Sequence, residues 1–283
     1  MFVVPAGAYL LLFFGYPLVK NIAMSVQQYT TTTFYTGEAP FVGLQNYSKV
    51  LSADLFSETV ITTVLFTAGS ICGQFVLGLA MALFFQHRFP LSRLLRSLLL
   101  LPWLLPLVVS GTTWRWMLDP DTGVVNAALR GLHLSSGVPW LTGTSQALVS
   151  VILVNIWVGI PFNTAILYGG LLNIPTHLYE AAKLDGAGPV MSFRHVTWPL
   201  LRPVVSVVLV LGVVYTVKVL DIILVVTGGG PAGATETIAT RAYELSFQQF
   251  EFGRGAVLNN VLIVFSLALA LVHLRTNRRA PTV

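Results

Sequence analysis

Two ionisable side chains, Lys218 and Asp221, stand inside an apolar run that covers residues 204–226. Tyr215 and Thr216 precede them in the same run. An ionisable side chain at the centre of a bilayer costs about 2.5–3.5 kcal/mol on insertion scales, so such residues face protein or water rather than lipid. If the run is helical, Lys218 and Asp221 are one turn apart and could pair. The pattern has two interpretations: a structural pair within one helix, or part of a translocation pathway.

A second group of chemically distinct residues interrupts the apolar run of residues 145–172. Asn155, Gly159 and Phe162 are separated by four and then three residues, which places them on one face of a helix. Pro161 lies beside this face and is expected to kink the helix.

The residue types needed for catalysis or metal binding do not occur in a suitable pattern. The single cysteine, Cys72, lies in an apolar run, and the five histidines are scattered: His87, His133, His177, His195 and His273. The sequence has no phosphate-binding loop, dinucleotide fingerprint or nucleophile elbow. We therefore predict no catalytic residue, no metal site and no cofactor in this chain, and no ATP hydrolysis by it.

The composition indicates an integral membrane protein. Of 283 residues, 55% are hydrophobic and 10% are charged, and the mean hydropathy is +0.77. A soluble domain has about 25% charged residues. Because a helix needs about 20 apolar residues to cross a bilayer, we expect a single domain over residues 1–283 with six transmembrane helices, at residues 1–19, 59–85, 94–117, 145–172, 204–226 and 255–274.

The basic residues between these spans predict the orientation. Nine of them lie in or beside connections that alternate along the chain and so share one side: Arg88, Arg93, Arg96, Lys183, Arg194, Arg202, Arg275, Arg278 and Arg279. The other side has six basic residues, Lys20, Lys49, Arg115, Arg130, Arg241 and Arg254, and also eight of the eleven acidic residues. Cytoplasmic loops carry an excess of Lys and Arg. We expect the first group, and both termini, to lie in the cytoplasm.

A polar segment, residues 173–203, separates the fourth and fifth spans. Glu180, Ala181 and Ala182 favour a helix, and Gly186 followed by Gly188-Pro189 ends it. A second short helix from Val190 should stop before Pro199. The segment is expected to form a cytoplasmic helix–turn–helix. The alternative is an ordinary cytoplasmic loop, which would have no reason to carry this order of helix-forming and helix-breaking residues.

This segment resembles the coupling loop of ABC importer permeases, which docks on a separate ATPase subunit. The resemblance rests on residues in the family's spacing: Glu180, Ala181, Ala182, Asp185, Gly186, Ala187, Phe193, Pro199 and Pro203. Four further segments resemble sugar-type permeases: residues 41–47, 123–126, 139–141 and 221–231. The last follows the pattern Asp-x-Ile-x-x-x-Thr-x-Gly-Gly-Pro of the first permease subunit in sugar importers.

The resemblance implies an all-α permease in a bacterial or archaeal cytoplasmic membrane that forms half of a translocation pathway by alternating access. It implies four kinds of partner besides the lipid bilayer: a second permease subunit, two ATPase subunits that carry ATP and Mg, and an extracytoplasmic sugar-binding protein. No nucleic acid is expected. The residues implied to couple to the ATPase are Glu180, Ala181, Ala182, Asp185, Gly186, Ala187, Phe193 and Pro199.

Carried over position by position, the family's solute pathway corresponds to Asn155, Gly159, Phe162, Gly212, Tyr215, Thr216 and Val219. To these we add Lys218 and Asp221. Lys218 departs from the uncharged residue of maltose-type permeases, so it would also suit a sugar phosphate or an acidic sugar.

Other functions remain open on the sequence alone. An ABC importer permease for a non-sugar solute, such as an amino acid or peptide, or for a phosphorylated solute is the main alternative. A membrane-embedded enzyme or scaffold is a second one. The segment of residues 221–231 favours a sugar.

Overall fold

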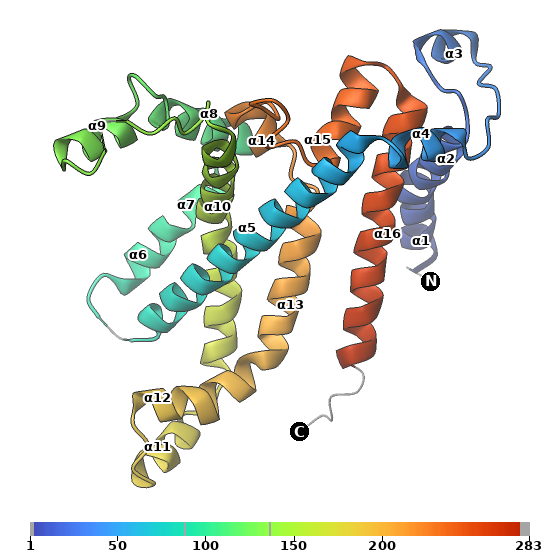
Figure 1. Cartoon of the computed structure of the whole chain (residues 1–283). Coiled ribbons are helices and arrows are strands. Elements are labelled where there is room, and N and C mark those ends of the chain that lie inside the picture. Colours follow the sequence, from blue (N-terminus) through green and yellow to red (C-terminus); the bar gives the residue numbers. More distant parts are fainter. Residues whose placement is uncertain (1–2, 88, 136, 278–283) are drawn as a thin grey trace. The chain divides into compact units, whose positions relative to one another are not determined.

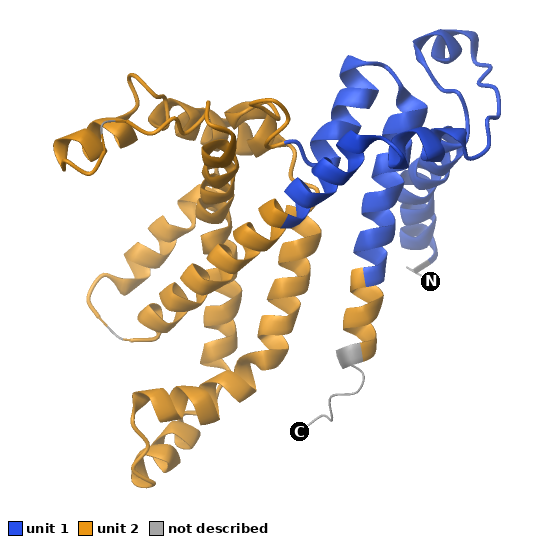
Figure 2. Cartoon of the chain, viewed as in Figure 1, with its two compact units in different colours: residues 1–64, 236–268 blue, residues 65–235, 269–283 orange. Residues whose placement is uncertain are grey.

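The computed structural model describes residues 3–87, 89–135 and 137–277 (Figure 1). Within these ranges every regular element is a helix, and strand-like pairing is limited to one isolated bridge between Gln27 and Phe41. The chain divides into two compact units (Figure 2). The prediction of an all-α protein is confirmed.

Unit 1 comprises residues 1–64 and 236–268. It opens with a continuous helical stretch made of α1 (Val3–Leu10), the π-helical turn η1 (Leu11–Gly15) and α2 (Tyr16–Ser25). Two short helices and the beginning of a long one follow: α3 (Thr31–Thr36), α4 (Gln45–Leu51) and α5 (Asp54–Gln86). The unit is completed by α15 (Ile238–Tyr243), the π-helical turn η3 (Glu244–Gln248) and most of α16 (Phe252–Asn277).

Unit 2 comprises residues 65–235 and 269–283. After the rest of α5 it contains α6 (Ser92–Leu99), α7 (Leu101–Leu104), α8 (Leu107–Met117), α9 (Val124–Gly131) and α10 (Thr144–Leu172). Then come α11 (Thr176–Leu184), α12 (Pro189–Ser192), the π-helical turn η2 (Phe193–Thr197), α13 (Trp198–Thr216) and α14 (Asp221–Val226).

The described residues contain five helical stretches that are long and apolar enough to cross a membrane: Val4–Ser25, Asp54–Gln86, Thr144–Leu172, Pro189–Thr216 and Phe252–Arg275. A sixth span results if Ser92–Leu104 and Leu107–Met117 are counted as one broken span. These segments overlap the six predicted spans.

The predicted third span is sharply bent, because its two halves meet at 95°. Pro106 accounts for the bend. Proline disfavours helical backbone at the residue before it, and Leu105 is extended, with φ −72° and ψ 142°.

The predicted fifth span, residues 204–226, is not one helix. Helix α13 ends at Thr216, residues 217–220 are not helical, and α14 begins at Asp221. Lys218 therefore lies in a break between two helices. The expectation that Lys218 and Asp221 are one turn apart on a continuous helix is wrong.

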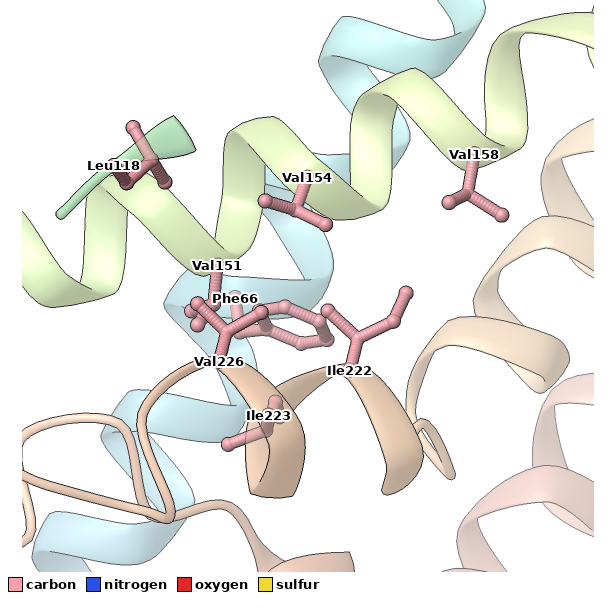
Figure 3. Close-up of a cluster of buried hydrophobic side chains, with 8 residues drawn as sticks. All are labelled: Phe66, Leu118, Val151, Val154, Val158, Ile222, Ile223 and Val226. Atoms are coloured by element: carbon pink, nitrogen blue, oxygen red, sulfur yellow. The ribbon is translucent and has the colours of Figure 1, made fainter. Parts of the chain in front are cut away.

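Close packing of α5 against α10 organises unit 2. Side chains of α10 fill the space that glycines leave on α5: Ile152 lies against Gly69, Ile156 against Gly73 and Asn163 against Gly78. Small residues let two membrane helices approach closely in this way. Beside this seam, Phe66 of α5 packs in a buried cluster with Val151 of α10 and Ile222 of α14 (Figure 3).

Two buried asparagines have structural roles in segments that resemble sugar permeases. In unit 1, Asn46 Nδ2 donates to the carbonyls of Ser25 (3.0 Å) and Gln27 (2.8 Å), which ties α4 to the end of α2. In unit 2, fully buried Asn126 accepts from Val138 N (3.1 Å) and Trp140 Nε1 (2.9 Å). Both asparagines hold connections between helices in place, so stabilisation of the fold accounts for their presence in these segments.

Candidate functional site

A cavity of about 420 Å³ lies within unit 2. Its walls come from α5, α7, α8, α10, α13, α14 and the connections beside them. The lining residues are Gln74, Trp103, Leu105, Leu107, Asn155, Val158, Gly159, Phe162, Asn163, Gly212, Tyr215, Thr216, Val219 and Ile222. Small-molecule sites generally have volumes of about 300–1,000 Å³.

The cavity brings together residues that the sequence assigned to a solute pathway from two distant segments. Those from α10 are Asn155, Gly159 and Phe162, and those from α13 and the break after it are Gly212, Tyr215, Thr216 and Val219. Lys218 and Asp221 are both exposed and do not line the cavity. The residues from α10 and α13 therefore form a single site. Their role in transport stays a prediction.

Three aromatic rings form a connected wall of this cavity. The ring centroids of Trp103 and Phe162 are 6.0 Å apart, and those of Phe162 and Tyr215 are 6.3 Å apart with the planes at 77°. Tyr215 is 58% exposed, so its ring retains accessible surface. Aromatic rings of this kind offer apolar surface to a bound molecule.

Amide groups supply the polar part of the cavity. Gln74 Nε2 donates to the backbone carbonyl of Asn155 at 2.9 Å, and Asn163 Nδ2 donates to the carbonyl of Gly159 at 2.9 Å. Asn155 is only 4% exposed, and its Nδ2 has no hydrogen-bond partner among the described residues. A buried donor without an acceptor is unfavourable, so a bound acceptor atom would satisfy it.

Sequence reasoning missed Gln74, which is 6% exposed and joins α5 to α10. A Cβ atom at Gly159 would overlap the side-chain amide of Gln74. Gly159 therefore makes room for this amide. The signal that could have revealed Gln74 is its position as an amide in the apolar run of residues 59–85.

The ammonium of Lys218 lies 5.1 Å from the ring centroid of Tyr215. The described residues contain ion pairs at Arg241 and Arg254, and Lys218 and Asp221 are in neither of them. The structural-pair interpretation of these two residues is therefore not supported by the geometry.

The polar segment after α10 forms a helix, a turn and a second helix. Helix α11 ends in a Schellman motif, in which Gly186 N donates to Lys183 O (3.0 Å) and Ala187 N donates to Ala182 O (2.9 Å). Gly186 has a φ of +79°, a conformation that suits glycine. Tyr179 Oη and Thr197 Oγ1, 3.0 Å apart, link the two helices.

The second helix of this segment does not stop before Pro199, contrary to the prediction. It continues through η2 into α13, and the helical stretch Pro189–Thr216 qualifies as one span. In η2 the N–H of Trp198 bonds to Phe193 O, five residues back. This π-helical turn shifts the hydrogen-bond register just before Pro199, which has no N–H to donate.

The residues assigned to coupling are on or near the surface of this segment. Glu180, Ala181, Asp185, Gly186 and Pro199 are exposed, and the half-buried ones are Ala182, Ala187 and Phe193. Large apolar side chains beside them are also exposed: Leu184 at 89% and Val190 at 81%. Such a patch at a helix–turn–helix tip is typical of a protein contact.

A family model described as "Binding-protein-dependent transport system inner membrane component" matches residues 74–279. This range is well over half of the chain and includes the cavity and the helix–turn–helix. The chain belongs to this family. It is therefore a multi-pass inner membrane component of a transport system and not an enzyme.

Similar proteins include the trehalose/maltose transport system permease protein MalF of Thermococcus litoralis, which is 35% identical over 98% of this chain and 92% of its own. The sulfoquinovosyl glycerol transport system permease protein SmoG of Agrobacterium fabrum is 32% identical over 97% of this chain and 88% of its own. The fold matches a chain of the bacterial alginate ABC transporter, crystallised in complex with alginate pentasaccharide-bound periplasmic protein. The TM-score is 0.83 at 20% identity, over 98% of this chain and 93% of that chain.

Proposed function

We propose that this chain is the permease subunit of an ATP-driven, binding-protein-dependent sugar importer. Its relatives are named for trehalose and maltose, for sulfoquinovosyl glycerol and for alginate. All of these solutes contain sugar units, although they differ in size and charge.

The observation that carries the proposal is the composition of the cavity. The walls combine the rings of Trp103, Phe162 and Tyr215 with the amides of Gln74 and Asn155. Aromatic rings stack on the apolar faces of sugar rings, and amides both donate and accept hydrogen bonds to hydroxyl groups. The volume of about 420 Å³ falls in the range of small-molecule sites.

The family relationship supports a working arrangement in which this single permease domain forms half of a translocation pathway. A second permease subunit forms the other half, and a periplasmic binding protein delivers the sugar, as the crystallised alginate transporter complex suggests. ATP and Mg are bound by two separate ATPase subunits. The excess of basic residues on one side supports a cytoplasmic location of the helix–turn–helix and of both termini.

In this arrangement residues 173–203 transmit the ATPase movement to the membrane helices. The exposed tip offers apolar surface at Leu184 and Val190 and a carboxylate at Glu180. The second helix is continuous with α13, whose last turn contributes Tyr215 and Thr216 to the cavity. A displacement of the tip would therefore be passed directly to the cavity wall.

Replacing Asn155 with alanine tests the site in the complete complex reconstituted with its binding protein. We expect a loss of about tenfold in sugar-stimulated ATPase, because one donor to a sugar oxygen is removed, with little change in basal ATPase. Asn259→Ala is the matched control, because Asn259 is an exposed amide of α16 in unit 1 that does not line the cavity and lies outside residues 173–203. Equal loss of both activities in Asn155→Ala would indicate a structural role and contradict the assignment.

A further inference from the structure

Lys218 lies in the break between α13 and α14, among four non-helical residues. Thr216, two positions before it, and Val219, directly after it, line the cavity. Its side chain is exposed and belongs to none of the ion pairs found among the described residues. Lys218 lies two residues beyond the end of the candidate span Pro189–Thr216, where its ammonium group can interact with water or with a ligand.

The ammonium group lies outside the cavity lining but close to one of the aromatic rings that form it. Lys218 Nζ is 5.1 Å from the ring centroid of Tyr215, and the ring of Tyr215 lines the cavity and packs edge-on against Phe162. A cation over an aromatic ring is held only weakly, by about 0.5–1 kcal/mol at an exposed site. The flexible four-carbon stem of lysine can then turn its charge toward an anion near that ring.

The charges around the cavity favour an anionic ligand. None of the described residues that line the cavity is charged, so no lining carboxylate repels an anion or neutralises Lys218. The buried Asn155 Nδ2 is a second donor without a partner. Asp221 carries the opposite charge and, like Lys218, is exposed and outside the cavity lining. Lys218 differs in lying 5.1 Å from the centroid of a lining ring, that of Tyr215.

We propose that Lys218 is a specificity-determining residue that selects sugars bearing an anionic group, such as a carboxylate, sulfonate or phosphate. This inference rests on the proposed sugar import and adds the charge class of the sugar. A structural alternative exists, because a lysine just after the end of α13 also complements the helix dipole. The two roles predict different effects of replacing Lys218. Only a specificity role makes the replacement affect anionic sugars more than neutral ones.

Uptake by the complete complex in proteoliposomes, with its binding protein, separates these roles. The probes are a neutral disaccharide, an oligosaccharide of uronic acids, a sulfonated glycoside and a sugar phosphate. We expect the wild type to take up at least one anionic probe. Lys218→Gln should lower kcat/KM for that probe about tenfold or more, the effect of one hydrogen bond to a charged group. The loss should be larger for that probe than for any neutral probe, a difference that a purely structural role would not produce.

Two further variants complete the comparison. Lys218→Arg keeps the charge and should restore most anionic uptake. Lys20→Gln is the matched control, because Lys20 is an exposed lysine whose Nζ lies 5.6 Å from the ring centroid of Tyr29 in unit 1, remote in sequence from the cavity residues. It should leave the preference unchanged. Every sample contains the same binding protein. Differences in uptake between variants therefore reflect the permease and not selection by the binding protein.

The outcomes distinguish this inference from the proposed function. Uptake of neutral sugars alone by the wild type would overturn the role of Lys218 and leave sugar import standing. Equal loss of anionic uptake and basal ATPase in Lys218→Gln would overturn it in favour of a structural role. No uptake of any probe by the intact complex would contradict sugar import itself.

Discussion

At the residue scale, Gly159 and Gln74 form a matched pair in the cavity wall. The glycine leaves the space that the buried amide occupies, and the amide bonds to the carbonyl of Asn155. Gly159 lines the cavity and makes room for the amide of Gln74, so substitutions at Gly159 should act through Gln74.

Gly159→Ala should therefore destabilise the chain by about 1–3 kcal/mol, the usual cost of overpacking a tightly packed interior. Thermal unfolding in detergent measures the effect as a fall in Tm. In a Gln74→Ala background the same substitution should cost little, because the obstructing amide is gone. Additive effects of the two substitutions would show that the residues are independent and contradict this pairing.

Glu236 is a second residue with a testable environment. It is 9% exposed, and its Oε1 lies 3.5 Å from Arg241 Nη1, while the same nitrogen lies 2.7 Å from Glu244 Oε2. The pKa of Glu236 is raised from 4.5 to about 7, mainly by burial. The neighbouring Glu244 also raises this pKa, and attraction to Arg241 opposes the shift.

Because the folded state holds the proton of Glu236 more tightly, this contribution to stability is complete below pH 4.5 and is lost as pH rises to about 7. Glu236→Gln should make Tm fall less between pH 5 and 7 than in the wild type. Glu251→Gln, which removes a carboxylate paired with Arg254, is the control and should keep the wild-type slope. An unchanged slope in Glu236→Gln would refute the assignment.

Only some of the residues that line the cavity could be identified from the sequence. Asn155, Tyr215 and Thr216 stand out as polar groups in apolar runs, and the structure brings them to one cavity. Gln74 carried the same signal, but no spacing in the sequence connects it to Gly159, 85 positions later. Its role depends on the register of α5 against α10, which is a tertiary property.

At the element scale, the two broken spans differ in how visible they are in the sequence. The 95° bend between α7 and α8 can be predicted from Pro106 in the sequence. No glycine or proline lies in residues 217–220, so the break between α13 and α14 has no local signal. We attribute this break to the packing of α14 side chains against α8 and α10, which form a buried cluster around Ile222.

The turn after α11 is the element whose geometry tests the coupling proposal. Gly186 and Gly188 both have open space where a Cβ would stand. Only Gly186 has a positive φ, +79°, whereas Gly188 has φ −72°. Gly186→Val should cost about 1–2 kcal/mol in backbone strain and reduce ATP-driven uptake at least tenfold without lowering the amount of protein in the membrane.

Gly188→Val adds the same side chain two positions away without this strain and should keep most uptake. Normal uptake in Gly186→Val would remove the turn from the coupling mechanism. Comparable losses in both variants would attribute the effect to side-chain bulk at the tip instead of to the shape of the turn.

At the scale of the whole molecule, class and family were accessible from the sequence, because they depend on features repeated along the chain. Apolar runs of span length, clustered basic residues and the order of helix and breaker residues around Gly186 all point to one permease family. Under the proposed function, the identity of the solute depends instead on a few side chains, such as Tyr215 and Lys218. Their arrangement follows from the fold and is not visible in the sequence.

The most direct test of the account is the ATPase activity of the complete complex in lipid bilayers with its binding protein. The sugar panel would contain trehalose, maltose, sulfoquinovosyl glycerol and alginate oligosaccharides. We predict that at least one of these sugars stimulates ATP hydrolysis and that the stimulation requires the binding protein. An intact complex that hydrolyses ATP at the same rate with every sugar and without any would contradict sugar import by this chain.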